Sequence, residues 1–290
     1  MAQAPEIDPA TGTPTTGHEW DGIRELNTPL PRWWLWLFYI TIVWAIGYWV
    51  VYPSWPLVSS YSRGVFGWQS RDAVVEDLRQ LKETRGPLMD KLAAASLQEI
   101  VADPQLLDFA RAVGKPAFAE NCAPCHGAGG GGARGYPNLN DDDWLWGGKL
   151  DDIAFTIRHG VRSGSEDARE SAMPAFGRDG ILKSDEIYNV VGYVRSLNNL
   201  ATPRANIEAG KKVFAENCAV CHGEAAKGNR ELGAPNLTDS IWLYGSSVPT
   251  LTETITNSRN GVMPTWAGRL DDVTLKALAV YVYTLGGGER

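Results

Sequence analysis

The hydrophobic pattern of the chain begins with one uninterrupted apolar run. Residues 33–52 (WWLWLFYITIVWAIGYWVVY) carry no charge and have no polar face. A helix of about 20 residues spans about 30 Å, the thickness of the bilayer hydrocarbon. Aromatic residues gather at both ends, as at membrane interfaces, and Pro53 and Pro56 follow. We therefore predict a transmembrane anchor over 32–56. A buried core helix or a cleaved signal peptide fits less well, because no face is polar and the preceding segment is long and acidic.

The region behind the anchor contains one pattern twice. GKPAFAENCAPCHG, PNL, WLWG and AMP recur as GKKVFAENCAVCHG, PNL, WLYG and VMP. Apolar residues then recur at helical spacing over 187–197 and 273–285, and each of these segments is expected to close its own repeat. Asp103 and Pro104 are typical of a helix N-cap and first turn.

These patterns predict a mainly α-helical protein with few strands. The expected division is a tail over 1–31, the anchor over 32–56, a spacer of short polar helices over 57–102, and two domains over 103–199 and 200–290. Residues 199–205 would join the two domains.

Each repeat contains the motif C-x-x-C-H, which is the signature of covalent haem c attachment. Two cysteines three positions apart on a helical turn face the same way, so both thiols can bond to one haem edge. The histidine behind them can bind the iron. A redox pair would not require the histidine, and a zinc site would lack a fourth ligand. The motifs therefore predict two covalently bound haem c groups, on Cys122, Cys125 and His126 and on Cys218, Cys221 and His222.

Two of the four methionines, Met173 and Met263, precede prolines at equivalent points of the repeats. Methionine thioethers are common second axial ligands of haem c, and they saturate the iron for electron transfer. Spacing permits each methionine to serve its own repeat or the other one; the first pairing is expected. A backbone carbonyl near Pro137 and near Pro235 is expected to orient each ligand histidine.

The net charge of −7 argues against nucleic-acid binding, which requires a basic face. Acidic residues concentrate in DDDWLWGGKLDD (141–152). This run either steers a basic electron carrier or is a solvated loop.

The two haem repeats resemble class I cytochrome c domains in tandem. The opening TGHEWDGIRELNTPLPRWW (16–34), followed by anchor, spacer and two C-x-x-C-H repeats, resembles the dihaem subunit III of cbb3-type cytochrome c oxidases, the CcoP/FixP family. The resemblance covers nearly the whole chain. It implies an electron-transfer subunit without a catalytic site of its own, with the motif residues and both methionines as haem ligands.

The resemblance also implies partners and a location. A soluble or membrane cytochrome c would donate electrons, which would pass through the monohaem cytochrome c subunit to the catalytic haem–copper subunit. Haem attachment implies periplasmic domains on a single-pass protein of the bacterial inner membrane, with a cytoplasmic N-terminus. The alternatives are the dihaem subunit of a membrane-bound dehydrogenase, a dihaem peroxidase with an open iron site, and a non-redox adaptor.

Overall fold

The structure, a computed structural model, describes residues 6–289. It divides into two compact units, residues 1–84 and 85–290. The first five residues of the predicted tail and Arg290 lie outside the described residues.

The tail forms a β-hairpin that the hydrophobic pattern did not predict. Strands β1 (Thr15–Trp20) and β2 (Ile23–Leu26) pair antiparallel, and Asp21 and Gly22 connect them. Both connecting residues have positive φ, 49° and 82°. Asp-Gly is a preferred sequence for a two-residue hairpin turn of this kind, so a local signal was present. The sequence patterns predicted few strands, and this signal was not used to predict the hairpin.

Helix α1 (Arg32–Val51) lies within the predicted anchor, 32–56, and ends five residues before its predicted limit. It is long and apolar enough to cross a membrane, and none of its residues is buried. A core helix would bury one face, so the exposure of α1 favours the predicted anchor over a core helix. Helix α2 (Ser70–Ala94) replaces the expected short helices of the spacer. It continues through Pro87, which removes one main-chain donor without ending the helix.

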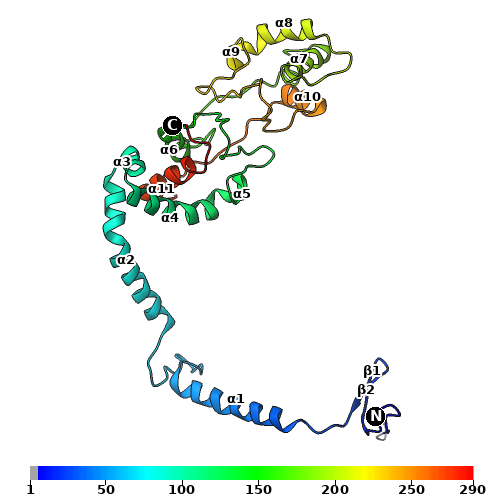
Figure 1. The fold of residues 1–290 in the computed structure, drawn as a ribbon, viewed down its shortest axis with the longest axis vertical. Helices are drawn as coiled ribbons and strands as arrows, with labels where there is room; N and C mark the ends of the chain where they lie inside the picture. Colours follow the sequence, from blue (N-terminus) through cyan, green and yellow to red (C-terminus); the bar gives the residue numbers. More distant parts are fainter. Residues whose placement is uncertain (1–5, 290) are drawn as a thin grey trace. The chain divides into compact units, whose positions relative to one another are not determined.

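The second unit is helical, as predicted, and its helices lie in two lobes (Figure 1). Asp103 caps the first long helix by accepting hydrogen bonds from the backbone of Gln105 and Leu106, as the sequence indicated. The first lobe consists of α3 (Leu97–Ala102), α4 (Pro104–Asn121), α5 (Ala123–His126), α6 (Leu150–His159) and α11 (Asp272–Tyr283). The second lobe consists of α7 (Ser184–Ser196), α8 (Ile207–Asn217), α9 (Ala219–His222) and α10 (Val248–Asn257).

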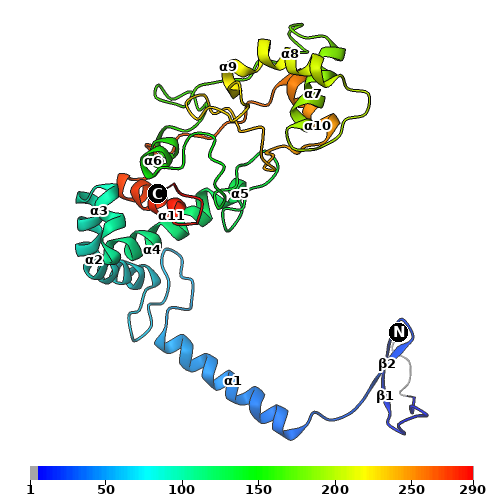
Figure 2. The same ribbon diagram turned by 45° about the horizontal axis from the view of Figure 1, so that its top comes forward.

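The two repeats exchange their closing helices. Helix α11 of the second repeat packs on α4 of the first, and α7 of the first repeat packs on α8 of the second (Figures 1 and 2). Phe118 packs against Tyr281 and Phe214 against Tyr193 in tilted pairs, each with ring centroids 5.3 Å apart. The prediction that 103–199 and 200–290 each close on themselves is therefore wrong as a spatial division.

Glycines permit these close helix contacts. A Cβ on Gly114 would lie 2.4 Å from the carbonyl oxygen of Ala277, and one on Gly210 would lie 2.0 Å from that of Asn189. The two repeats carry the same glycine and the same aromatic pair, so these contact residues do not distinguish one closing helix from the other. Local sequence therefore leaves the choice open.

The segment between α7 and α8 explains which arrangement forms. Arg195 donates to Thr202 and to the carbonyl of Ala201, and the Tyr188 hydroxyl donates to the carbonyl of Pro203. These bonds fold the segment back, so that α7 and α8 become neighbours, as short connections between helices usually require. Residues 199–205 are thus a loop within the second lobe instead of a joint between two domains.

Candidate haem sites

The two cysteine motifs adopt the same backbone geometry. In each, the first cysteine ends one helix and begins a short second one, and its carbonyl accepts from the backbone N–H of the second cysteine and of the histidine. The distances are 3.1 and 2.9 Å in both motifs. Gly127 and Gly223 end these turns at φ of 79° and 77°, a conformation that favours glycine. The predicted single turn carrying both thiols is confirmed.

Both histidines are oriented by a proline carbonyl, as predicted. Nδ1 of His126 lies 3.0 Å from the carbonyl oxygen of Pro137, and Nδ1 of His222 lies 3.0 Å from that of Pro235. Because a carbonyl can only accept, Nδ1 carries the proton and donates it. In a neutral ring, Nε2 is then the unprotonated nitrogen, which is the one that can bind a metal. Burial lowers the pKa of His222, against the opposing effect of this hydrogen bond, and favours the neutral ring.

Each methionine lies in the lobe that contains the cysteine motif of the other repeat. Met263, from the second repeat, packs against the core that contains Cys122, and Met173, from the first repeat, packs against the core that contains Cys218. Each methionine therefore packs in the lobe that holds the cysteine motif of the other repeat, which differs from the packing within one repeat that the expected pairing requires. The reason is the helix exchange, because each methionine precedes the closing helix that changes lobe.

Two chain segments, 160–173 of the first repeat and 258–263 of the second, contact each other where the chain passes between the lobes. We call this contact the crossing, and the segments run antiparallel at Val161 and Met263. Val161 exchanges backbone hydrogen bonds with Met263, at 2.9 and 3.0 Å, and the Ser258 hydroxyl donates to the carbonyl of Met173 at 2.6 Å. Gly160 and Ser258 occupy equivalent positions behind α6 and α10, both with positive φ. Serine gives no sequence signal for this conformation, so the crossing could not be predicted from local pattern.

The four cysteines form no disulfide, so all four sulfurs are available for thioether bonds. Burial, with a smaller effect from the second cysteine of each pair, raises the pKa of Cys122 and Cys218 to about 11. A reactive redox pair instead needs a lowered thiol pKa. Near the crossing, the buried Nε of Arg169 has no hydrogen-bond partner among residues 6–289, and haem carries propionate carboxylates of the kind that satisfy such a donor. The residues present fit haem c.

His159 lies outside the cysteine motifs, at the end of α6. Its ring packs on Phe155 at 4.5 Å between centroids, and its Nδ1 lies 3.6 Å from a carboxylate oxygen of Asp167.

The acidic run meets an acidic residue of the other repeat. Burial, and then the charges of Asp239 and Asp141, raise the pKa of Asp143 to about 6. Further along the run, Asp152 pairs with Arg169 at 3.3 Å and Asp151 accepts from Gln98 at 2.8 Å. The run is thus partly neutralised by neighbours within the protein.

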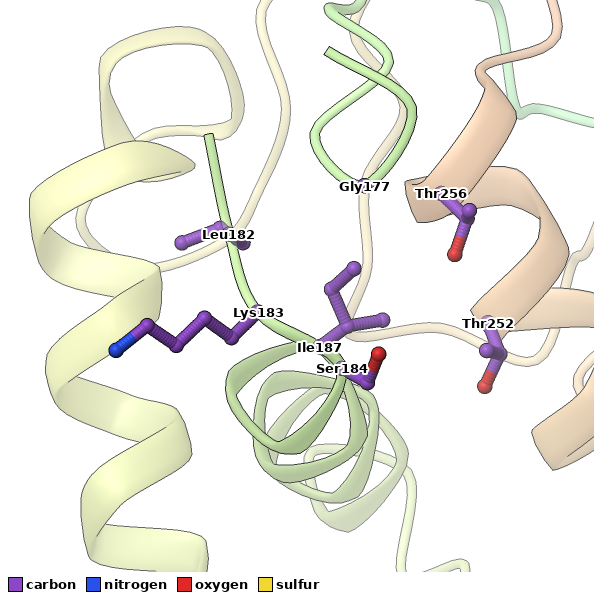
Figure 3. Close-up of a pocket in the computed structure, with 7 residues that line it drawn as sticks. All are labelled: Gly177, Leu182, Lys183, Ser184, Ile187, Thr252 and Thr256. Carbon is purple, nitrogen blue, oxygen red and sulfur yellow. The ribbon is translucent and has the colours of Figure 1, made fainter. Parts of the chain in front are cut away.

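A separate cavity of about 210 Å³ lies in the second lobe between the start of α7 and α10. Ser184, Thr252 and Thr256 contribute hydroxyls to its wall, while Lys183 extends away from the two threonines (Figure 3). No cysteine, histidine or methionine of the haem motifs lines it. It lies beside the contact between α7 and α10 and does not belong to the haem sites.

Two matched C-x-x-C-H turns, each with an oriented histidine and a methionine in the same core, define a tandem c-type cytochrome. The comparisons specify the family. Residues 12–59 match the N-terminal domain of cytochrome oxidase-cbb3, FixP; residues 112–198 match cytochrome c; and residues 205–282 match cytochrome c oxidase, cbb3-type, subunit III.

Curated relatives match along the full length. The cbb3-type cytochrome c oxidase subunit FixP of Bradyrhizobium sp. (strain ORS 278) is 61% identical over 290 residues, all of both chains. Subunit CcoP of Azospirillum brasilense is 51% identical over 296 residues, again all of both chains. Subunit CcoP of Cereibacter sphaeroides is 50% identical over 277 residues, 95% of this chain and 96% of the relative. The chain belongs to the FixP/CcoP family of cbb3-type cytochrome c oxidase subunits.

Proposed function

We propose that this chain carries two covalently bound haem c groups and relays electrons within a cbb3-type oxidase. Cys122 and Cys125 would hold the first haem through thioether bonds, and Cys218 and Cys221 the second. The observation that carries the proposal is the pair of matched turns, each with Nδ1 of its histidine on a proline carbonyl. This hydrogen bond fixes the ring and keeps Nε2 available for iron.

The axial ligands follow from the exchanged lobes. His126 and Met263 would ligate the first haem iron, and His222 and Met173 the second. Histidine and methionine together supply a saturated, high-potential iron that passes electrons and offers no position to a substrate. The chain therefore has no catalytic site of its own and acts as an electron-transfer subunit of an oxidoreductase complex.

The proposed partners are the catalytic haem–copper subunit, the monohaem cytochrome c subunit, and a soluble or membrane cytochrome c as donor. The relatives are named as subunits of a cbb3-type oxidase, which supports the first two. Helix α1 would anchor the chain in the bacterial inner membrane in a single pass. The N-terminus would be cytoplasmic and the haem lobes periplasmic, where haem c is attached.

Attachment is tested first. The intact full-length chain should weigh more than the polypeptide by two haem groups, and the double variants Cys122→Ala/Cys125→Ala and Cys218→Ala/Cys221→Ala should each lose one. A chain without this added mass would refute the proposal.

Membership of the oxidase is tested by purifying the complex through this chain. The purified complex should contain haem b and copper, whereas co-purification with a quinone or flavin dehydrogenase would assign the chain to another complex.

The ligand pairing is tested with single-haem chains. In the Cys218→Ala/Cys221→Ala background, Met263→Leu should abolish the red-region charge-transfer absorption of methionine-bound ferric haem, and Met173→Leu should leave it unchanged. The reverse result would restore the pairing within each repeat. The opposite cysteine background, with the two leucine variants interchanged, is the matched control.

A further inference from the structure

Arg162 lies in the crossing between the lobes in an unfavourable backbone conformation. Its φ is 50°, a region that residues with a side chain seldom adopt outside asparagine and aspartate. Its backbone N–H donates to the carbonyl of Arg169 at 2.9 Å, directly beside the Val161–Met263 pairing. A strained position of this kind persists only where surrounding contacts hold it.

The guanidinium of Arg162 supplies such contacts to both crossing segments. Its Nε donates to the carbonyl of Gly261 at 2.8 Å, and its Nη1 donates to the carbonyl of Ser171 at 2.6 Å. Gly261 lies two residues before Met263, and Ser171 lies two residues before Met173. One planar, forked cation therefore holds the main chain immediately before each methionine.

The second repeat has no equivalent of this bridge. Asn260 occupies the matching position, because Ser258 matches Gly160. The neighbouring Arg259 stays within its own repeat: its guanidinium stacks over Tyr244 at 4.9 Å, and its Nε donates to Thr254. The bridge through Arg162 is thus asymmetric, one side chain of the first repeat acting on the methionine segments of both lobes.

We propose that Arg162 is a positioning residue shared by the two haem sites, which fixes both methionine segments through one guanidinium. The proposal rests on methionine ligation of the two irons. A methionine sulfur binds iron only while its main chain stays in place, and here one side chain restrains both. Removing that side chain should therefore weaken iron–methionine ligation at both haems together, although Arg162 belongs to a single repeat.

Arg162→Gly is the most informative variant, because glycine adopts the positive φ freely, so the side chain and both of its hydrogen bonds are removed without added backbone strain. The full-length chain with both haems attached should be purified in detergent. We expect partial loss of the methionine charge-transfer absorption from both ferric haems and a downward shift of both midpoint potentials, since methionine ligation raises the haem potential. The reduced variant should also bind carbon monoxide, whereas thermal unfolding should stay close to that of the unmodified chain.

Two further variants test whether the effect of Arg162→Gly comes from the two guanidinium hydrogen bonds, from the positive charge alone, or from the loss of any arginine. Arg162→Lys keeps the charge but has one ammonium in place of the fork, so it should recover only part of the loss. Arg178→Ala removes an exposed arginine whose guanidinium contacts its neighbour Asp179, and it should leave spectra and potentials unchanged.

The possible outcomes are distinct. Unchanged absorption and potentials in Arg162→Gly, or a change at one haem alone, would overturn the shared role. Full recovery in Arg162→Lys would show that charge suffices and would overturn the bridging geometry. Absence of the methionine absorption already in the unmodified chain would instead refute the proposed ligation, on which the role of Arg162 rests.

Discussion

The exchange of closing helices makes a quantitative prediction about aromatic coupling. In the structure Phe118 pairs with Tyr281, with ring centroids 5.3 Å apart and planes inclined by 52°. Had each repeat closed on itself, Phe118 would pair with Tyr193 instead. Substituting leucine singly and in pairs at these three positions therefore separates the two arrangements.

The expected coupling energy between Phe118 and Tyr281 follows from the separation of their rings. Aromatic pairs at this separation contribute about 0.5–1.5 kcal/mol beyond the area they bury, so the coupling energy of Phe118 and Tyr281 should be about 1 kcal/mol. Phe118 and Tyr193 belong to different cores, and the effects of substituting residues without shared partners add to within about 0.5 kcal/mol. Phe118→Leu alone should cost about 1–2 kcal/mol, because its side chain is 1% exposed.

Thermal unfolding of the full-length haem-loaded chain, followed by circular dichroism and haem absorbance, measures these terms. For a folded unit of this size, 1 kcal/mol corresponds to about 2–4 °C in Tm. The double variant at Phe118 and Tyr281 should thus unfold about 3 °C above the value expected from adding the single effects. Additive effects for that pair, or coupling between Phe118 and Tyr193, would refute the exchanged packing.

Two further predictions concern stability. Gly210→Ala should lower the free energy of unfolding by about 3 kcal/mol or more, because its Cβ would lie 2.0 Å from the Asn189 carbonyl oxygen and α8 would have to move. Gly86→Ala, with open space around it, should raise the free energy of unfolding by up to about 1 kcal/mol through helix propensity. Burial and the charge of Asp239 raise the pKa of Asp143 from 3.8 to about 6, so the folded state binds this proton more tightly and stability falls as pH rises from about 4 to about 6. Asp143→Asn should therefore stabilise by about 1 kcal/mol at pH 7, a value reduced for partial exposure, and have little effect at pH 4.

Both predictions are checked by thermal unfolding of the same haem-loaded chain. Equal Tm values for the Gly210 and Gly86 variants would contradict the close contact of α7 with α8. A Tm gain for Asp143→Asn that is the same at pH 4 and pH 7 would show that ionisation of Asp143 is not its source.

The sequence by itself determined the local chemistry of this protein. The apolar run predicted helix α1, and the Asp103 cap predicted the start of α4. The C-x-x-C-H-G pattern predicted a single turn presenting two thiols and a histidine, and the repeated proline predicted the carbonyl that orients each ring. These features depend on residues close together in the chain, where spacing fixes geometry. The Asp-Gly hairpin was equally local, so its signal was present but overlooked.

Only the tertiary structure decided which parts of the two repeats form one lobe. Both repeats carry the same glycine at the helix contact and the same tyrosine on the closing helix, so their packing surfaces are interchangeable. The choice depends on the folded-back segment between α7 and α8, and on crossing contacts such as those of Val161 and Arg162. These contacts join residues far apart in the chain. Duplicated sequences give the same local signals twice, and only long-range contacts distinguish a repeat that closes on itself from one that closes on its neighbour.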